Sequence, residues 1–249
     1  LMKPVELGNL ATALERALHK RAMAIEQRKV ERLIREEVAA QTEELRAERE
    51  MLNSMVLYTV TALVRARETK DVFLRGHSDR VADLAASIAT TLGLSDDEVE
   101  AIRLAGRVMD VGNIGLKESV MNKPGALTPE EFDHVKTHVE IGLSILSPIK
   151  PLAHVLTAVA HHHENFDGNG YPGRLSGEGI SLGGRILAAA DAYDALVSPR
   201  AWRAGMAPPE AVTLLAEHSG TRLDPKVFEA LKANVHRRKT LEWLAPVTD

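Results

Sequence analysis

Histidines are concentrated in one part of this sequence of 249 residues. Seven of the ten histidines lie between His77 and His163, and the run His161-His162-His163-Glu164 is their densest part. Several of these histidines, and nearby aspartates, stand in apolar helical surroundings and are separated by whole helices. Imidazole and carboxylate groups together suit Fe, Mn or Zn, and shared carboxylates suit hydrolysis by two metal ions that clamp a phosphate group. The sequence therefore indicates a metal centre for phosphoryl chemistry.

The elements that must position these side chains are all predicted to be helices. Thr128 matches a helix N-cap, and Ser95 with Glu98 three residues later matches a capping box. The glycine-rich stretch from Phe166 to Leu182 is the one clear loop, and we find no convincing strand and no internal repeat. The expected fold class is therefore all-α. The helices are expected at Asp83 to Leu92, Asp96 to Val108, Pro129 to Leu146, Leu152 to His163, Gly184 to Leu196, Pro209 to His218 and Pro225 to His236.

A long helix is predicted to precede these elements, because residues 9–75 contain neither glycine nor proline. Val38, Leu45 and Leu52 recur every seven residues, which is typical of a coiled-coil seam. We favour a parallel homodimer through this helix, and polar residues at two inward positions keep a solvated single helix open as the alternative. The leucines of residues 7–18 give the apolar face of a separate, earlier helical segment.

Composition narrows the class of protein. A net charge of −4 gives no overall field that attracts nucleic acid or an acidic membrane, so neither is expected as a partner. The absence of cysteine excludes disulfides and thiolate metal sites. No apolar run approaches the roughly 20 residues that span a bilayer, and no secretion signal is seen, so we expect a cytoplasmic protein. Since aromatic residues make up only 4%, the core must consist mainly of Leu, Val, Ile and Ala.

Five segments, in order along the chain, resemble motifs of the HD-GYP domain family. Together they cover roughly residues 67 to 205. The resemblance implies a helical HD-superfamily bundle preceded by a long N-terminal helix or coiled coil. The matching segments are Arg75 to Val81, Asn122 to Thr128, Lys136 to Gly142, His162-His163-Glu164-Asn165-Phe166-Asp167-Gly168-Asn169-Gly170-Tyr171-Pro172, and Ala190 to Leu196.

The resemblance implies a substrate, a cofactor and a ligand set. The substrate would be cyclic di-GMP. The cofactor would be a divalent transition metal, one or two ions, with Fe or Mn favoured and Zn, Ni or Mg as further candidates. Asp110 would bridge the two ions and is the candidate catalytic residue. The implied metal ligands are His77, Asp110, His138, His162, His163 and Asp191.

Other histidines and aspartates of this region are not expected to bind metal. His134, His154 and His161 have no counterpart among the implied ligands, so we expect them at the surface or in support of the ligands. Asp167 and Asp194 are expected to cap or orient their neighbours.

The resemblance also implies substrate contacts. Arg200 and Arg203 match positions that contact substrate phosphates, and the guanidinium fork suits a phosphodiester. Two surface arginines that follow a helix are an equally open alternative. Asn113 and Tyr171 complete the candidate substrate-binding residues. The Gly-Tyr-Pro loop, in which Tyr171 is expected to be exposed, is also a candidate contact for a protein partner.

The sequence departs from the family at the motif that names the superfamily. Met109 precedes Asp110 where the family has histidine, and Asn113 replaces a lysine. A thioether binds Fe(II) or Mn(II) poorly, so one metal position is expected to be weakened while the other is intact. Phe73 stands where some members have a further metal-binding glutamate, so we expect no third metal ion.

Two functions of different classes follow. In the first, the domain is a cyclic di-GMP phosphodiesterase of bacterial second-messenger signalling, attenuated by loss of the HD histidine. In the second, it is a catalytically inactive module that binds cyclic di-GMP or a protein partner and transmits a signal. The paired loss of histidine and lysine around Asp110 motivates the second. A third alternative makes the helical segment before residue 67 the working part.

The first residues suggest what lies upstream. Lys3-Pro4 and the helix after it resemble the end of a response-regulator receiver domain. We therefore expect residues 1–18 to be the last helix of a truncated receiver, residues 19–66 to be a coiled-coil linker, and residues 67–249 to be the HD-GYP domain. A phosphorylated receiver would then change the pitch or register of the dimer helix, and with it the access to the metal site.

Overall fold

The computed structural model describes residues 7–70, 73–121, 123, 125–200 and 203–239, and the regular secondary structure of these residues is helical. Two isolated bridges, Arg200 with Arg203 and Ser219 with Leu223, do not extend into strands. The predicted all-α class is therefore confirmed. The main helices are α1 (Leu7–Glu68), α2 (His77–Thr91), α3 (Asp96–Val108), α4 (Glu118–Met121), α5 (Pro129–Lys136), α6 (His138–Leu146), α7 (Leu156–His161), α8 (Leu182–Val197), α9 (Pro208–Ala216) and α10 (Pro225–Lys239). Short 3-10 helices are η1 (Val111–Gly115), η2 (Lys150–Val155) and η3 (Gly177–Gly179).

Helix α1 is 62 residues long, so the predicted long N-terminal helix is confirmed. It runs without interruption through residues 18 and 19, where we expected two separate segments, because nothing in this stretch breaks a helix. Contacts divide the chain into two units, Leu1–Val56 and Leu57–Asp249. The predicted division into receiver helix, linker and HD-GYP domain stays a prediction, and Lys3-Pro4 lies outside the described residues.

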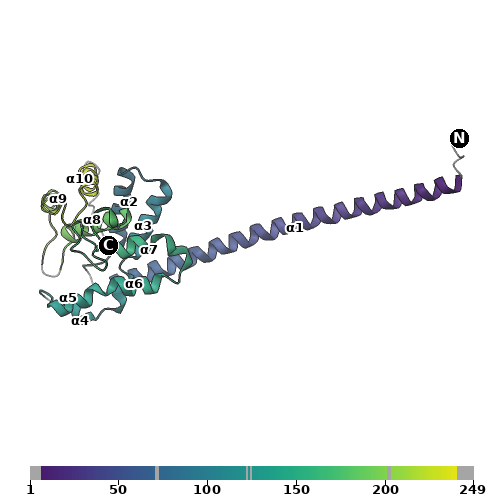
Figure 1. The fold of residues 1–249 in the computed structure, drawn as a ribbon. Helices are drawn as coiled ribbons and strands as arrows, with labels where there is room; N and C mark the ends of the chain where they lie inside the picture. The colour runs from purple at the N-terminus through teal and green to yellow at the C-terminus, as the bar shows by residue number, and fades with distance from the viewer. Residues whose placement is uncertain (1–6, 71–72, 122, 124, 201–202, 240–249) are drawn as a thin grey trace. The chain divides into compact units, whose positions relative to one another are not determined.

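The second unit has a core of aliphatic side chains, as the composition predicted. Helix α8 packs against α2, α7, α9 and α10, and α2 packs against α3 (Figure 1). Ile88, Ile186, Leu187 and Leu231 are completely buried in this core. Helix–helix burial of this kind supplies the main stabilisation of an all-α fold.

Helices α2 and α3 form a close antiparallel pair because small residues meet between them. A Cβ atom added to Gly106 would lie 2.8 Å from the Cα atom of Ala82. The short connection from α2 to α3 begins the second helix at Ser95, whose capping box with Glu98 is present as predicted. The pair brings the start of α2 next to the end of α3.

Helix α2 begins at His77, six residues earlier than the predicted start at Asp83. No Ser, Thr, Asp or Asn caps it; its N-cap is Gly76, with a positive φ of 69°. The buried carboxylate of Glu68, at the end of α1, instead accepts hydrogen bonds from the N–H groups of Gly76 (2.9 Å) and Ser78 (2.7 Å). A cap supplied from outside the local sequence explains the wrong prediction.

Two other predicted helices are divided. The predicted helix Pro129 to Leu146 breaks at Thr137, whose hydroxyl and N–H both bond the carbonyl of His134, three residues back. Such local bonds compete with the α-helical ladder. The N-cap at Thr128 is confirmed. The predicted helix Leu152 to His163 is a 3-10 turn followed by α7, which ends at His161.

The remaining helix predictions agree with the structure to within a few residues. Helices α8, α9 and α10 lie where Gly184 to Leu196, Pro209 to His218 and Pro225 to His236 were expected. The short elements α4, η1 and η3 were not predicted. They are too brief to show a hydrophobic period in sequence.

Replacement of Glu68 by alanine is expected to destabilise the second unit. Two N–H groups at the start of α2 would lose a charged acceptor in a buried position, so the free energy of unfolding should fall by about 2–4 kcal/mol. Urea denaturation of the full chain measures this. Asp79→Asn is the matched control, because it breaks the more exposed Arg65–Asp79 pair between the same helices and should cost less than about 1 kcal/mol. Equal losses in both variants would contradict the capping role.

Candidate metal centre

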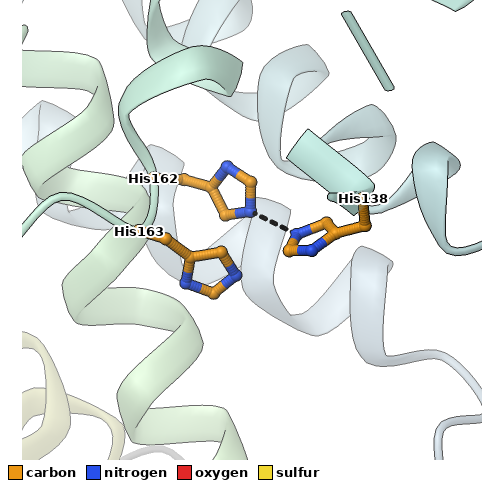
Figure 2. Close-up of side chains that lie close together, drawn as sticks. All are labelled: His138, His162 and His163. Carbon is orange, nitrogen blue, oxygen red and sulfur yellow. Dashed lines mark hydrogen bonds between the residues drawn. The ribbon is translucent and has the colours of Figure 1, made fainter. Parts of the chain in front are cut away.

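Three histidines from two separate places in the chain converge in the second unit (Figure 2). His138 is the first residue of α6, and His162 and His163 directly follow α7. One ring nitrogen from each lies within 4.8 Å of the others. The Nε2 atoms of His138 and His162 are 3.3 Å apart, and both side chains are almost completely buried. The spacing is that of ligands around one cation.

The hydrogen bonds of these rings test whether a cation fits. The Nδ1 atom of His138 contacts the carbonyl oxygen of Val135 at 2.7 Å, and that of His162 contacts the carbonyl oxygen of Val159 at 2.6 Å. A carbonyl only accepts, so both Nδ1 atoms carry the proton and both neutral rings present a lone pair at Nε2. Burial lowers the pKa of His162, which disfavours a second proton there. A metal ion would satisfy both lone pairs, so the donor set fits one.

Asp110 lies between this cluster and a second group of candidate ligands. One carboxylate oxygen is 3.6 Å from Nε2 of His138, and the other is 3.4 Å from Nε2 of His77. Asp191 lies on the His77 side, with an oxygen 3.4 Å from the same Nε2 atom. The structure therefore brings all six predicted ligands together, with one oxygen of Asp110 near His138 and the other near His77. The predicted bridging role of Asp110 stays a prediction.

A close backbone contact holds Asp110 near His138. Gly112, two residues after Asp110, packs flat against the start of α6. A Cβ atom at Gly112 would lie 2.6 Å from the N atom of Gly142 and would overlap the carbonyl oxygen of His138. Only glycine allows the backbone to come this close to α6. Close packing, and not metal binding, therefore explains the glycine at this position.

Asp194 and Arg80 orient His77. The Asp194 carboxylate contacts Nδ1 of His77 at 2.7 Å and accepts two hydrogen bonds from Arg80, at 2.7 and 3.0 Å. These contacts leave Nε2 of His77 facing Asp110 and Asp191. Asp194 thus has the orienting contacts that the sequence suggested, whereas Arg80 was missed. Its place one helical turn after His77 was the available signal.

The electrostatics of the group follow from burial and close charges. Burial alone would lower the pKa of His77, but the bonds with Asp110 and Asp194 raise it to about 10. Burial alone would raise the pKa of Asp110, but His77 and His138 hold it well below its usual range. Burial raises the pKa of Asp191 and lowers that of His163. The close carboxylates thus favour the protonated form of His77, and the close imidazoles favour the ionised form of Asp110.

A glycine-rich loop forms one wall of a cavity beside these residues. Buried Glu164 accepts hydrogen bonds from the N–H groups of Gly173 and Leu175, which fixes the loop after the histidine pair. A Cβ atom at Gly170 would lie 2.2 Å from the N atom of Asn165, so this glycine is required by close packing. Tyr171 stacks on the ring of His163, with centroids 4.8 Å apart, and is half-buried, less exposed than expected.

The cavity has a volume of about 1020 Å³ and reaches from the metal-binding candidates to the surface. Its size is in the range of small-molecule sites. Its lining contains two candidate ligand histidines and Asp191, together with three cationic side chains. The lining residues are Phe132, Asp133, Lys136, Thr137, Glu140, His162, His163, Glu164, Asn165, Gly168, Asn169, Gly170, Tyr171, Pro172, Arg174, Ala188, Asp191 and Arg222.

Of the four predicted substrate-binding residues, Tyr171 lines this cavity, and Asn113, Arg200 and Arg203 are not among its lining residues. The guanidinium of Arg203 donates to the carbonyls of Ala195 (2.7 Å) and Leu196 (2.8 Å), at the end of α8. Arg203 thus caps a helix, and its predicted role in substrate binding stays a prediction. The same holds for Arg200 and Asn113.

Met109 is almost completely buried and belongs to the hydrophobic core. It stands at the C-cap of α3, directly before Asp110. The core therefore has an apolar side chain where the family resemblance implied a histidine. Phe73 is 38% exposed. Two residues of a quoted motif, Asn122 and Pro124, lie outside the described residues.

Three histidines that were not expected to bind metal have other surroundings. A ring nitrogen of His134 accepts from the N–H of Lys117 at 3.2 Å, and one of His161 accepts from the N–H of Ser181 at 3.1 Å. His154 is exposed. These contacts support the local backbone.

The fold and the converging histidines and aspartates define a class of protein. The family model described as HD domain matches residues 62–227. The match covers more than half of the chain and includes all six converging residues. The chain belongs to the HD domain family.

Its relatives include named phosphodiesterases. The 3'3'-cGAMP-specific phosphodiesterase 3 of Vibrio cholerae is 36% identical over 173 residues, which are 70% of this chain and 38% of the relative. The cyclic di-GMP phosphodiesterase response regulator RpfG of Xanthomonas campestris is 38% identical over 175 residues, 70% of this chain and 46% of the relative. The chain thus spans less than half the length of these relatives.

Solved structures show the same fold. A cyclic GMP-AMP specific phosphodiesterase of V. cholerae matches with a TM-score of 0.57 at 19% identity, over 79% of this chain and 51% of that one. An HDG"Y"P protein from Bdellovibrio bacteriovorus matches with a TM-score of 0.54 at 22% identity, over 64% and 51%. Among the described residues, no helix is both long enough and apolar enough to cross a membrane.

Proposed function

We propose that the second unit is a metal-dependent phosphodiesterase domain of the HD-GYP type whose substrate is cyclic di-GMP. The observation that carries this proposal is the pair of buried Nε2 lone pairs of His138 and His162, which face each other beside Asp110. His162 and its neighbour His163 also line the cavity. The names of the V. cholerae and X. campestris relatives support a cyclic dinucleotide as substrate.

The residues favour one strong metal position. His138, His162, His163 and Asp110 would hold an ion of Fe or Mn through three imidazoles and a carboxylate, a donor set that suits both metals. When bound, the ion supplies positive charge that stabilises a phosphodiester under attack by water. Asp110 is the candidate catalytic residue because its two oxygens face both groups of ligands.

A second metal position would be weaker. It would have His77, Asp191 and the second oxygen of Asp110. Met109 has a thioether in place of an imidazole, and its side chain packs in the core. Asn113 would also leave this side without the charge of a lysine. We therefore propose that activity is attenuated relative to a domain with the complete motif.

The second candidate is a catalytically inactive module that binds cyclic di-GMP, or a protein partner at the Gly-Tyr-Pro loop. The replacement of two motif residues around Asp110, by Met109 and Asn113, is the observation that favours it. In either case the X. campestris relative, named a response regulator, supports an upstream receiver. Phosphorylation of that receiver would regulate the domain through α1.

The unpartnered apolar stripe of α1 supports a homodimer. Within the first unit, Val38, Leu45 and Leu52 are each more than half exposed at heptad spacing. We propose that a second copy of the chain covers them in a parallel coiled coil.

Loss of one cluster histidine is expected to remove metal and activity together. His162→Ala should lower the affinity for Mn(II) or Fe(II) by about a hundredfold or more. Loss of a residue that binds the metal directly should cost at least as much affinity as loss of a residue that hydrogen-bonds to a ligand. Elemental analysis and hydrolysis of cyclic di-GMP measure this on the full chain. His161→Ala is the matched control, because the neighbouring ring bonds only the N–H of Ser181 and should leave both unchanged.

Two further results separate the candidate functions. Restoring the motif with Met109→His and Asn113→Lys should raise turnover of an attenuated enzyme. The enzymatic proposal would be rejected if the chain bound no metal and did not hydrolyse cyclic di-GMP in excess Mn(II) or Fe(II). If that chain still bound cyclic di-GMP, the signalling module would replace it.

The dimer proposal predicts a change of mass. Leu45→Glu should convert a dimer to a monomer in light scattering, because it places like charges in the seam. Ala47→Glu adds the same charge two residues away, outside the seam, and should leave the dimer intact. A monomer for the unaltered chain would contradict the proposal.

A further inference from the structure

Lys136 lies at the side of the cavity in unusual surroundings. Its Nζ atom is 4.7 Å from the ring centroid of Phe132 and 5.9 Å from that of Tyr171, and the two rings meet edge to face. The side chain is 35% exposed, and Nζ contacts the carboxylate of Asp133 at 2.7 Å. Since Asp133 is 72% exposed, this pair is weak and leaves the ammonium group available to an anion.

Arg222 lines the same cavity from the loop after α9. Its backbone is fixed, because its N–H donates to the carbonyl of His218 and its carbonyl accepts from the N–H of Phe166. Its side chain is exposed, and it lines the cavity together with His162 and His163. Lys136 and Arg222 thus offer cations from two separate elements.

We propose that Lys136 and Arg222, here called the cationic rim, bind the phosphate groups of a cyclic dinucleotide, and that the exposed face of Phe132 takes a base. This inference rests on the proposed function. The rim supplies the positive charge that Asn113 does not, and the guanidinium of Arg203 is already bonded to carbonyls of α8. Phosphates attract ammonium and guanidinium groups, and bases stack on aromatic rings.

The shape of the site supports this assignment. Tyr171 stacks on His163 and stands next to Phe132, so the aromatic rings connect the rim to the histidine cluster. A dinucleotide with a phosphodiester at the cluster would therefore have its second phosphate and a base within reach of the rim. Buried Glu164 is bonded to loop amides and so does not compete for the rim cations.

Two variants that break the same ion pair test the proposal. Lys136→Gln removes the cation and should raise the Kd for cyclic di-GMP about tenfold, the usual size of one charged hydrogen bond. Asp133→Asn frees the same cation and should lower the Kd about two- to threefold. A merely structural ion pair would make both variants change binding in the same direction. Calorimetric titration of the full chain with cyclic di-GMP, in EDTA and with Mn(II), gives these values.

Controls keep the result specific. Lys123→Gln removes a lysine of similar exposure (31%), which pairs with Glu131 but does not line the cavity, and should leave the Kd unchanged. Arg222→Gln should behave like Lys136→Gln. Circular dichroism verifies that each variant is folded.

The outcomes separate this inference from the proposed function. An unchanged Kd for Lys136→Gln in a chain that hydrolyses cyclic di-GMP would overturn the rim alone. Opposite shifts for Lys136→Gln and Asp133→Asn in a chain without hydrolysis would support the rim and overturn only catalysis. If the unaltered chain does not bind cyclic di-GMP at all, the rim is overturned as well.

Discussion

Two imidazole rings, those of His138 and His162, are each fixed by a bond from Nδ1 to the carbonyl three residues earlier in the chain. Each ring therefore directs an unprotonated Nε2 atom at the other, in a place that water hardly reaches. Two lone pairs at 3.3 Å repel unless a proton or a cation lies between them. The rest of the site depends on this pair of rings, because two close and buried lone pairs favour a cation bound between them.

The ends of several helices position these rings and the other candidate ligands. The break at Thr137 starts α6 at His138, and α7 ends at His161, so that His162 and His163 leave the helix together. Gly112 lets the turn after α3 pack directly on α6, which brings Asp110 to the rings. On the other side, Glu68 starts α2 at His77. The local irregularities of the fold therefore coincide with the candidate ligands.

Much of this could be predicted from sequence because its causes are local. Two helix caps depend on contacts between residues only three positions apart. The capping box of Ser95 with Glu98 and the cap at Thr128 are both present. The all-α class followed from composition and spacing. The ligand set followed from resemblance to a family in which the order of motifs is kept, and the structure then brought those residues together.

What the sequence could not predict depends on contacts between distant parts of the chain. The start of α2 is set by Glu68, which belongs to another helix. Nothing in the sequence indicated that the guanidinium of Arg203 bonds carbonyls at the end of α8, and its predicted contact with substrate phosphates stays a prediction. Lys136 had no predicted role, and its place beside Phe132 and Tyr171 in the cavity lining is visible only in the structure.

The most direct test of the central claim is X-ray absorption spectroscopy at the metal edge, on the full chain loaded with one equivalent of Mn(II) or Fe(II). Three imidazole rings around the ion should contribute scattering, with one ring lost in His138→Ala. A tightly bound ion without imidazole scattering, or a spectrum unchanged by His138→Ala, would contradict that claim.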